Sequence, residues 1–132
     1  MKHIILTILS LFCATAFAFN SFWPGKSLNP EAVREKWGNE KFEAKRFHDG
    51  GAKVRATMTY DLLMKQKEFI GKNAAEIRSL LGNFSGFYFS DAYPTYLIDK
   101  GKQKGDDVWQ IVFLIDKSRH VTEIIVHKNC CD

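Results

Sequence analysis

Cysteine is scarce in this chain, which excludes a small fold held together by disulfides. Only 3 of its 132 residues are cysteine, and Cys130 and Cys131 are neighbours near the end of the sequence. Adjacent Cα atoms lie about 3.8 Å apart, whereas disulfides usually need roughly 4.4–6.8 Å, so a bond between these two is unfavourable. In an oxidising compartment the expected outcomes are intermolecular bonding, as in a disulfide-linked dimer through Cys130 or Cys131, or mixed disulfides.

An excess of charge of one sign is also lacking. The sequence has 19 Lys and Arg against 15 Asp and Glu, a formal net charge of +4. Removal of residues 1–18, argued below, takes away Lys2 and leaves 18 basic against 15 acidic residues. Nucleic-acid binding requires a strongly basic surface, so this balance predicts no nucleic-acid partner.

Long apolar runs are absent except at the N-terminus, where the flanking residues are typical of an export signal. Lys2 precedes an apolar segment at residues 4–11, and the small-residue motif Ala16-Phe17-Ala18 follows it. The apolar stretch is shorter than the roughly 18–20 residues of a spanning helix, which disfavours an uncleaved anchor. Signal peptidase accepts small side chains at both alanines, so we expect cleavage between Ala18 and Phe19 and a periplasmic or secreted mature protein.

A lipid anchor is not expected. Cys13 is the cysteine that would carry it, but Phe12 precedes it and Ser10 lies three residues before it. A lipobox has a small residue and usually a leucine at those two positions. The sequence therefore predicts a mature protein that is not a lipoprotein.

Residues 19–52 are expected to form an N-terminal arm and one short helix. Pro24, Gly25 and two serines show no periodicity, which indicates a loosely held segment up to residue 29. Asn29 followed by Pro30 is a helix-start signal, and Gly38 ends the helix two turns later. Residues 38–51 show no clear period.

Two helices are predicted next. Apolar residues at four-residue spacing indicate an amphipathic helix over residues 53–67. For residues 74–81, Asn73 is placed to cap the helix, Glu76 stands where a capping box needs it, and Gly82 follows the end. Its predicted apolar face consists of Ile77, Leu80 and Leu81. The short link through Gly71 predicts that the two helices form a hairpin.

Three strands are predicted over residues 93–99, 108–116 and 120–128, where the spacing of apolar residues changes from helical to that of an extended strand. Their short polar connections favour an antiparallel meander. Alternation places Trp109, Ile111, Phe113 and Ile115 toward the helices, while Val112 and Leu114 give the other face an apolar character. That second face is expected to be partly covered by the arm or by a partner. The predicted fold is α+β, a helix hairpin packed on a three-stranded meander (ααβββ), over residues 53–128, followed by a tail at 129–132.

This order of elements resembles the SmpA/OmlA superfamily of outer-membrane assembly factors, the BamE-like domains. The segments that carry the likeness are residues 58–63 (MTYDLL), 69–72 (FIGK), 75–82 (AEIRSLLG), Tyr96 and residues 109–116 (WQIVFLID). The resemblance implies a cell-envelope protein, with a protein partner and peripheral association with the outer membrane. Members of the assembly-factor branch are typically lipoproteins, which this chain is not expected to be. The same layer order is similar to the repeat unit of beta-lactamase inhibitory proteins, which implies an inhibitory alternative.

The segment between the last predicted helix and the first strand is rich in aromatic residues. Phe87, Tyr88, Phe89 and Tyr93 lie there among Ser, Gly, Asp and Pro. Exposed aromatic residues on loops often anchor a partner protein, although such rings also cap an open core. Alternate side chains of an extended segment face opposite ways, so Tyr88 is predicted to be exposed if its two neighbours pack, or the reverse.

The sequence gives less support to catalysis or metal binding than to a protein-contact function. His127, Cys130 and Cys131 have metal-ligand side chains, but a structural zinc site usually needs four ligands. The pair His48-Asp49 lies beside a glycine turn, and Asp106-Asp107 lies in a predicted hairpin loop. We therefore expect no enzyme and no cofactor, and a binding or assembly-accessory domain that works through protein contacts. The alternatives are an inhibitor or immunity-like protein and, with less support, a metal-binding protein.

Overall fold

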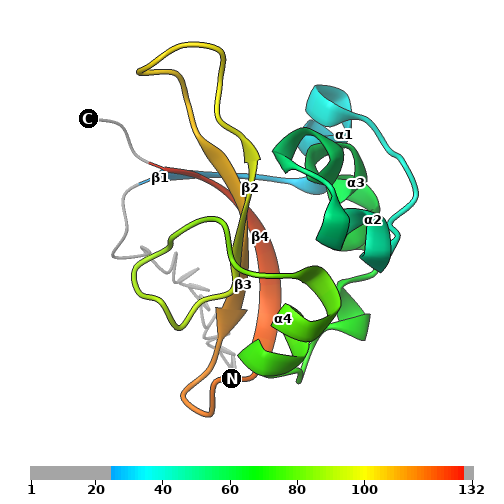
Figure 1. Cartoon of the computed structure of the whole chain (residues 1–132), viewed down its shortest axis with the longest axis vertical. Coiled ribbons are helices and arrows are strands. Elements are labelled where there is room, and N and C mark those ends of the chain that lie inside the picture. Colours follow the sequence, from blue (N-terminus) through cyan, green and yellow to red (C-terminus); the bar gives the residue numbers. More distant parts are fainter. Residues whose placement is uncertain (1–24, 130–132) are drawn as a thin grey trace, which may run out of the picture.

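The computed structural model describes residues 25–129, in which helices cover one face of a four-stranded antiparallel sheet (Figure 1). The elements in chain order are β1 (Gly25–Leu28), α1 (Pro30–Trp37), α2 (Ala44–Asp49), α3 (Ala52–Met64), the short 3-10 helix η1 (Gln66–Glu68), α4 (Ala74–Leu81), β2 (Thr95–Asp99), β3 (Trp109–Ile115) and β4 (Val121–Asn129). The predicted signal peptide, its cleavage site at Ala18 and Phe19, and the tail cysteines Cys130 and Cys131 lie outside the described residues.

The sheet has the strand order β1-β4-β3-β2, and all neighbours are antiparallel. The α+β class and the predicted meander of the last three strands are thus confirmed. The strand count differs, because residues 25–28 of the predicted loose arm pair with residues 126–129 of β4. Gly25, Lys26 and Ser27 have little strand-forming signal, so backbone pairing with β4 decides their conformation.

Local capping signals place two helices where the sequence predicts them. The Asn29 side chain accepts a hydrogen bond from the Ala32 N–H at 2.9 Å, which begins α1. Asn73 and Glu76 form a reciprocal capping box at the start of α4. The helix predicted for residues 53–67 instead ends at Met64, and η1 follows it.

The helix layer differs from the predicted hairpin because residues 44–49 form an additional helix, α2. This helix contacts both α3 and α4, whereas α3 packs mainly against α1 and β2. Phe47 of α2 is fully buried in the core. The burial of this ring stabilises a six-residue helix whose sequence shows no helical period.

The core lies between the helices and the sheet, and aromatic rings dominate it. Phe47, Phe69 and Tyr96 lie edge-to-face with neighbouring rings at centroid distances of 5.2–6.0 Å, and Phe113 contacts the last two. Ile77 and Leu81 are the buried residues of α4, whereas Leu80 is 40% exposed. The prediction that Leu80 belongs to the apolar face is therefore wrong.

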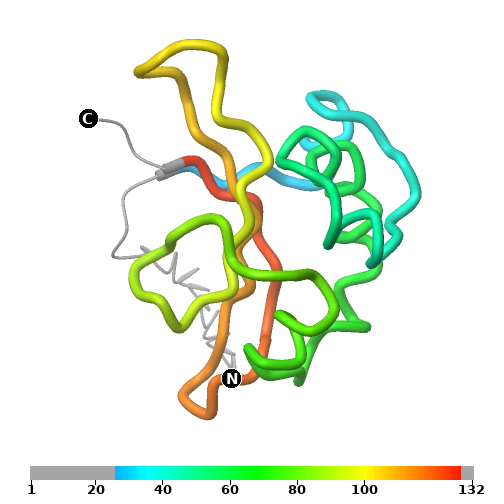
Figure 2. The backbone as a smooth tube through the Cα atoms, viewed as in Figure 1, coloured from blue at the N-terminus to red at the C-terminus, as the bar shows by residue number. Residues whose placement is uncertain are grey.

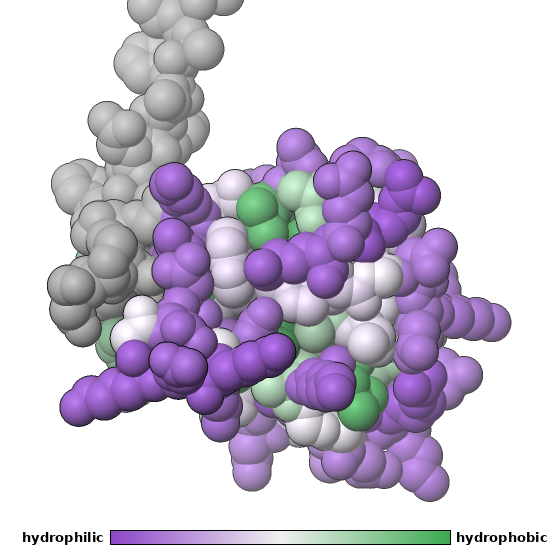
Figure 3. All heavy atoms as spheres, turned by 90° about the horizontal axis from the view of Figure 1, so that it is seen from above, coloured by the Kyte–Doolittle hydropathy of each residue, from purple (hydrophilic) through white to green (hydrophobic). Residues whose placement is uncertain are grey.

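Polar side chains dominate the end of the molecule at which the β2–β3 connection lies (Figure 3). Asp106 organises this connection, because its carboxylate accepts hydrogen bonds from the N–H groups of Lys102 (2.7 Å) and Gln103 (2.8 Å). These bonds to Gln103 and Lys102 lower the pKa of Asp106. Asp107 lies 3.3 Å from the Lys128 ammonium group. Both acids thus have structural partners in a hairpin loop.

Candidate functional site

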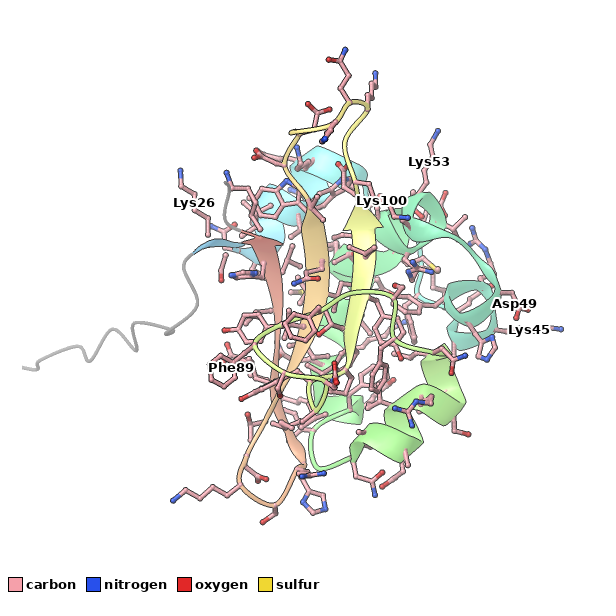
Figure 4. The ribbon with its side chains drawn as sticks, turned by 60° about the vertical axis from the view of Figure 1, so that its left-hand side comes forward. Lys26, Lys45, Asp49, Lys53, Phe89 and Lys100 are labelled. Atoms are coloured by element: carbon pink, nitrogen blue, oxygen red, sulfur yellow. The ribbon has the colours of Figure 1, made fainter. Side chains whose placement is uncertain are left out.

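The aromatic loop, defined as residues 83–94 between α4 and β2, lies on the face of the sheet opposite the helices. The backbone passes from the end of α4 around the sheet to this outer face and returns to start β2 (Figures 2 and 4). Register places Gln110, Val112 and His127 on the outer face, and all three are buried. The sequence predicted a cover for this face from the arm or a partner, but the aromatic loop contacts it directly.

The base of the loop is fixed by hydrogen bonds to β2. The N–H groups of Ser85 and Gly86 both donate to the Thr95 carbonyl at 3.0 Å. The Ser85 hydroxyl accepts from the Leu97 N–H at 3.0 Å and from the Arg55 guanidinium at 3.2 Å. These bonds hold the first residues of the loop against the edge strand.

Arg55 connects the loop to the helix layer. Its guanidinium also donates to the carbonyl groups of Leu97 (3.0 Å) and Gly50 (2.8 Å), so one side chain joins three segments. Burial lowers the pKa of Arg55, while the nearby Tyr96 opposes that shift. The arrangement stabilises the loop through a charge-assisted network.

Gln110 fixes the middle of the loop. Its side-chain amide accepts from the Phe87 N–H at 3.3 Å and donates to the Phe87 carbonyl at 2.7 Å. This double contact requires a close approach at Gly86, where a Cβ atom would lie 2.5 Å from the Gln110 side-chain oxygen and 2.8 Å from a Thr95 methyl group. The sequence analysis did not single out Gln110 or Gly86. The sequence signal for Gln110 is a polar residue within an apolar strand, and the signal for Gly86 is a glycine between aromatic residues.

Tyr88 is the buried anchor of the loop. It is only 7% exposed, and its ring lies edge-to-face with Tyr93 (5.4 Å) and His127 (5.0 Å). Phe87 and Phe89 on either side are 47% and 56% exposed. The predicted alternation is therefore confirmed in its second form, with the tyrosine packed and both phenylalanines at the surface.

Phe89 has a strained backbone and projects from the loop at the edge of the molecule (Figure 4). Its φ angle is +59°, in the left-handed region that side chains with a Cβ rarely adopt. Its ring also lies 6.4 Å from that of Tyr93. Such strain costs on the order of 1–3 kcal/mol and is concentrated at functional sites, which makes this position a candidate contact residue.

Other aromatic rings at the start of the loop belong to the core. Phe84 lies edge-to-face with Tyr96 at 5.8 Å, and the Arg78 guanidinium lies 4.5 Å above its ring. The Tyr96 hydroxyl donates to the Gly82 carbonyl at 2.7 Å, and burial raises the pKa of this phenol. The two interpretations of the aromatic segment thus apply to different rings, with Phe84 capping the core and Phe87 and Phe89 facing outward.

The side chains with possible chemistry do not come together in the described residues. His127 is buried on the outer face beneath Tyr88, and its two proposed metal-ligand companions lie outside the described part of the chain. Within residues 25–129, no three His, Cys, Asp or Glu side chains form a group suited to a metal ion. His48 and Asp49 are exposed and lie 3.0 Å apart at the end of α2.

None of the helices between residues 25 and 129 combines the length and apolar character needed to cross a lipid bilayer. The chain matches no protein-family model, and no curated protein and no solved structure is significantly similar to it.

Proposed function

We propose that this protein is an exported cell-envelope domain that binds another protein through the aromatic loop and catalyses no reaction. The observation that carries this proposal is the pair of exposed rings, Phe87 and Phe89, on either side of the buried Tyr88. The predicted export signal and the resemblance to the SmpA/OmlA superfamily are the sequence features that support a location at the cell envelope.

The loop is organised before any partner binds. Gln110 bonds both backbone groups of Phe87, Ser85 is bonded to two neighbours, and Tyr88 packs between two rings. A preformed contact surface avoids the entropy loss of ordering a loop, which costs about 0.5–1.5 kcal/mol for each immobilised side chain. The observed strain at Phe89 fits the same role, since a stabilised loop holds that ring outward.

Phenylalanine rings at these two positions fit the chemistry of protein interfaces. Aromatic residues are enriched at such interfaces, and the few residues that dominate affinity each cost about 2 kcal/mol or more when truncated. Neither ring is needed to fill the main core, which lies on the other side of the sheet. We therefore assign Phe87 and Phe89 as anchors, and Tyr88 and Tyr93 as the rings that position them.

The experiment begins with co-purification from a cell-envelope extract and identification of the bound protein. Phe87→Ala and Phe89→Ala should then weaken binding by roughly 1–2 kcal/mol or more, while the free energy of unfolding of Phe87→Ala changes by about 0.5 kcal/mol or less. Leu80→Ala is the matched control, because Leu80 is an exposed apolar residue on the helix side. The proposal fails if both phenylalanine variants bind like the parent, or if Leu80→Ala weakens binding equally.

Export is tested separately by the intact mass of the protein recovered from the cell envelope. The expected N-terminus is Phe19 without a lipid. A diacylglycerol group on Cys13 would contradict this part of the proposal and leave the loop experiment unaffected.

A further inference from the structure

The excess positive charge of the described residues is concentrated at one end of the sheet. Of the 19 basic and 15 acidic residues of the chain, only Lys2 and Asp132 lie outside residues 25–129, which leaves 18 and 14. Six of these basic residues and three of these acids belong to the end from which the β2–β3 connection projects, so the remainder is almost balanced at 12 and 11. We name this region the lysine end, and its charged members are Lys26, Lys36, Lys100, Lys102, Lys104 and Lys128, with Asp99, Asp106 and Asp107.

Strand register joins the base of the lysine end into one row across the sheet. Lys26 of β1 pairs with Lys128 of β4. On the next two strands, Lys128 pairs with Trp109 and Trp109 pairs with Asp99. Like charges directly opposite each other on neighbouring strands destabilise a sheet. The pair of Lys26 and Lys128 is therefore a place where an added negative charge is favourable.

Helix α1 adds a lysine beside this row. The Lys36 ammonium nitrogen lies 5.4 Å from the centre of the Trp37 ring and 6.0 Å from that of Trp109. The Trp37 ring in turn lies edge-to-face with Trp109 at 5.8 Å. Cation–π attraction holds the ammonium group near the two rings without neutralising its charge. Lys36 thus lies close to the strand partner of Lys128.

The β2–β3 connection carries the other three lysines and projects beyond the end of the sheet (Figures 1 and 4). Lys100, Lys102 and Lys104 alternate along it, and all three are exposed. None of them forms an ion pair with another of residues 25–129, and the same holds for Lys26 and Lys36. Five of the six lysines therefore have no carboxylate partner in the described part of the chain.

The three acids of the lysine end are bonded to groups of the chain itself. Asp99 accepts hydrogen bonds from the Trp37 indole at 3.1 Å and from a backbone N–H of the connection at 2.8 Å. Asp106 accepts from two further backbone N–H groups there, and Asp107 lies 3.3 Å from the Lys128 ammonium group. These acids shape the connection, and only Asp107 pairs with a lysine.

An acidic protein segment fits this surface better than a membrane does. The large apolar side chains exposed among residues 25–129 all belong to other regions, so the lysine end has none to insert among lipid tails. The lysines follow a path from the edge strand β1 across the sheet end and out along the projecting connection (Figure 1). A flat bilayer contacts only the tip of such a projection, whereas an extended chain can follow the whole path.

We propose that the lysine end binds an extended, acidic segment of another protein, whose carboxylates pair with the lysines of the sheet row and of the connection. Each exposed ion pair contributes little, so affinity depends on several pairs acting together and falls as salt screens them. The Asp107 carboxylate competes with this segment for Lys128. The surface is separate from the aromatic loop, so the inference does not rest on the function proposed above.

The test uses the folded full-length protein and an acetylated, amidated peptide of eight alternating aspartate and glutamate residues. Titration calorimetry and amide shifts follow binding at low salt. The double variant Lys102→Gln with Lys104→Gln should bind about four- to twentyfold more weakly, at roughly two- to fivefold for each exposed pair. The matched control is Lys117→Gln with Arg119→Gln, which removes the same net charge from the exposed β3–β4 turn at the other end of β3. This control should change the affinity by less than about twofold, because its charges lie more than a Debye length from the peptide.

A substitution with the opposite effect sharpens the test. Asp107→Asn should strengthen peptide binding by about two- to fivefold, because it frees Lys128. Glu123→Gln removes one exposed negative charge from β4 outside the lysine end and should leave the affinity nearly unchanged. All of these substitutions replace exposed side chains, and unchanged amide shifts elsewhere in each variant confirm that it is folded.

Four outcomes would overturn the proposal. The peptide does not bind at low salt, or its binding is insensitive to an increase from about 0.02 M to about 0.2 M salt. The two double variants weaken binding alike, which means that net charge alone attracts the peptide. Finally, vesicles of phosphatidylcholine and phosphatidylserine in equal parts displace the peptide and lose their binding in the variant of Lys102 and Lys104, which means that the partner is an anionic membrane.

Discussion

The two faces of the sheet are covered in different ways. On the helix side, Ile111, Phe113 and Val126 are buried in one apolar cluster with residues from the helices. On the outer face, the aromatic loop contacts Gln110 through side-chain hydrogen bonds to Phe87 and His127 through the ring of Tyr88. The packing of the helix side therefore depends on the volume and shape of apolar side chains. The attachment of the loop to the outer face depends on the identity of a few polar and aromatic residues.

This difference assigns stability mainly to the helix side of the sheet and partner recognition to the outer face. Large apolar side chains buried on the helix side supply most of the hydrophobic stabilisation, at about 25 cal/mol per Å² of apolar surface. The outer face adds less buried apolar surface but fixes the geometry of two exposed rings. Changes on the helix side should therefore affect folding, and changes in the loop should affect the contact surface.

The largest expected effect comes from Phe113 of β3, which is fully buried in the core on the helix side of the sheet. Phe113→Ala leaves a cavity and should lower the free energy of unfolding by about 3–5 kcal/mol. Phe87→Ala, on the outer side, should lower it by about 0.5 kcal/mol or less. Chemical denaturation of both variants measures the difference, and equal losses would contradict the separation of the two faces.

Adjacent leucines in α4 give a more closely matched test. Leu81 is almost fully buried, whereas Leu80 is 40% exposed. Leu81→Ala should lower the free energy of unfolding by about 2–5 kcal/mol, and Leu80→Ala by only about 0.5 kcal/mol. The two substitutions remove the same atoms and change helix propensity equally, so the difference in burial accounts for the difference in stability. A larger loss for Leu80→Ala would mean that α4 is rotated about its axis relative to the structure.

Gln110 tests the polar attachment of the loop. Gln110→Ala removes both bonds to Phe87 in a buried place and should cost about 1–3 kcal/mol. Hydrogen exchange at the Phe87 amide should accelerate by more than exchange in β4. Gln103→Ala, in the exposed β2–β3 connection, is the control that should change neither quantity. An unchanged exchange rate in Gln110→Ala would show that ring packing alone holds the loop.

The smallest effect is expected at Phe89, where glycine and alanine should differ. Both substitutions remove the exposed ring, but only glycine adopts a φ angle of +59° without strain. Phe89→Gly should therefore be more stable than Phe89→Ala by up to about 1 kcal/mol, after the extra chain entropy of glycine is subtracted. Thermal and chemical denaturation measure this difference, while both variants should lose partner binding to a similar extent. A more stable alanine variant would contradict the strained backbone.

Short-range signals allowed much of the fold to be predicted. The caps at Asn29 and Asn73 mark helix starts because a side-chain oxygen bonds a backbone N–H two or three residues away, within the same segment. Alternation along residues 109–115 places one face toward the helices because successive side chains of a strand point to opposite sides. The alternation around Tyr88 was predicted for the same reason, but which set of rings faces inward was not.

The tertiary structure alone decided those features that are stabilised by contacts between residues far apart in the chain. Strand β1 forms because β4 offers it a backbone edge about a hundred residues later, and α2 forms because Phe47 fills a place beside Tyr96. The loop lies on the outer face because Gln110 bonds Phe87 from a distant strand. The sequence by itself determined the capped helices, the meander and the aromatic composition of the loop, since those depend on neighbours. Long-range burial and pairing determined which rings are anchors and which are exposed.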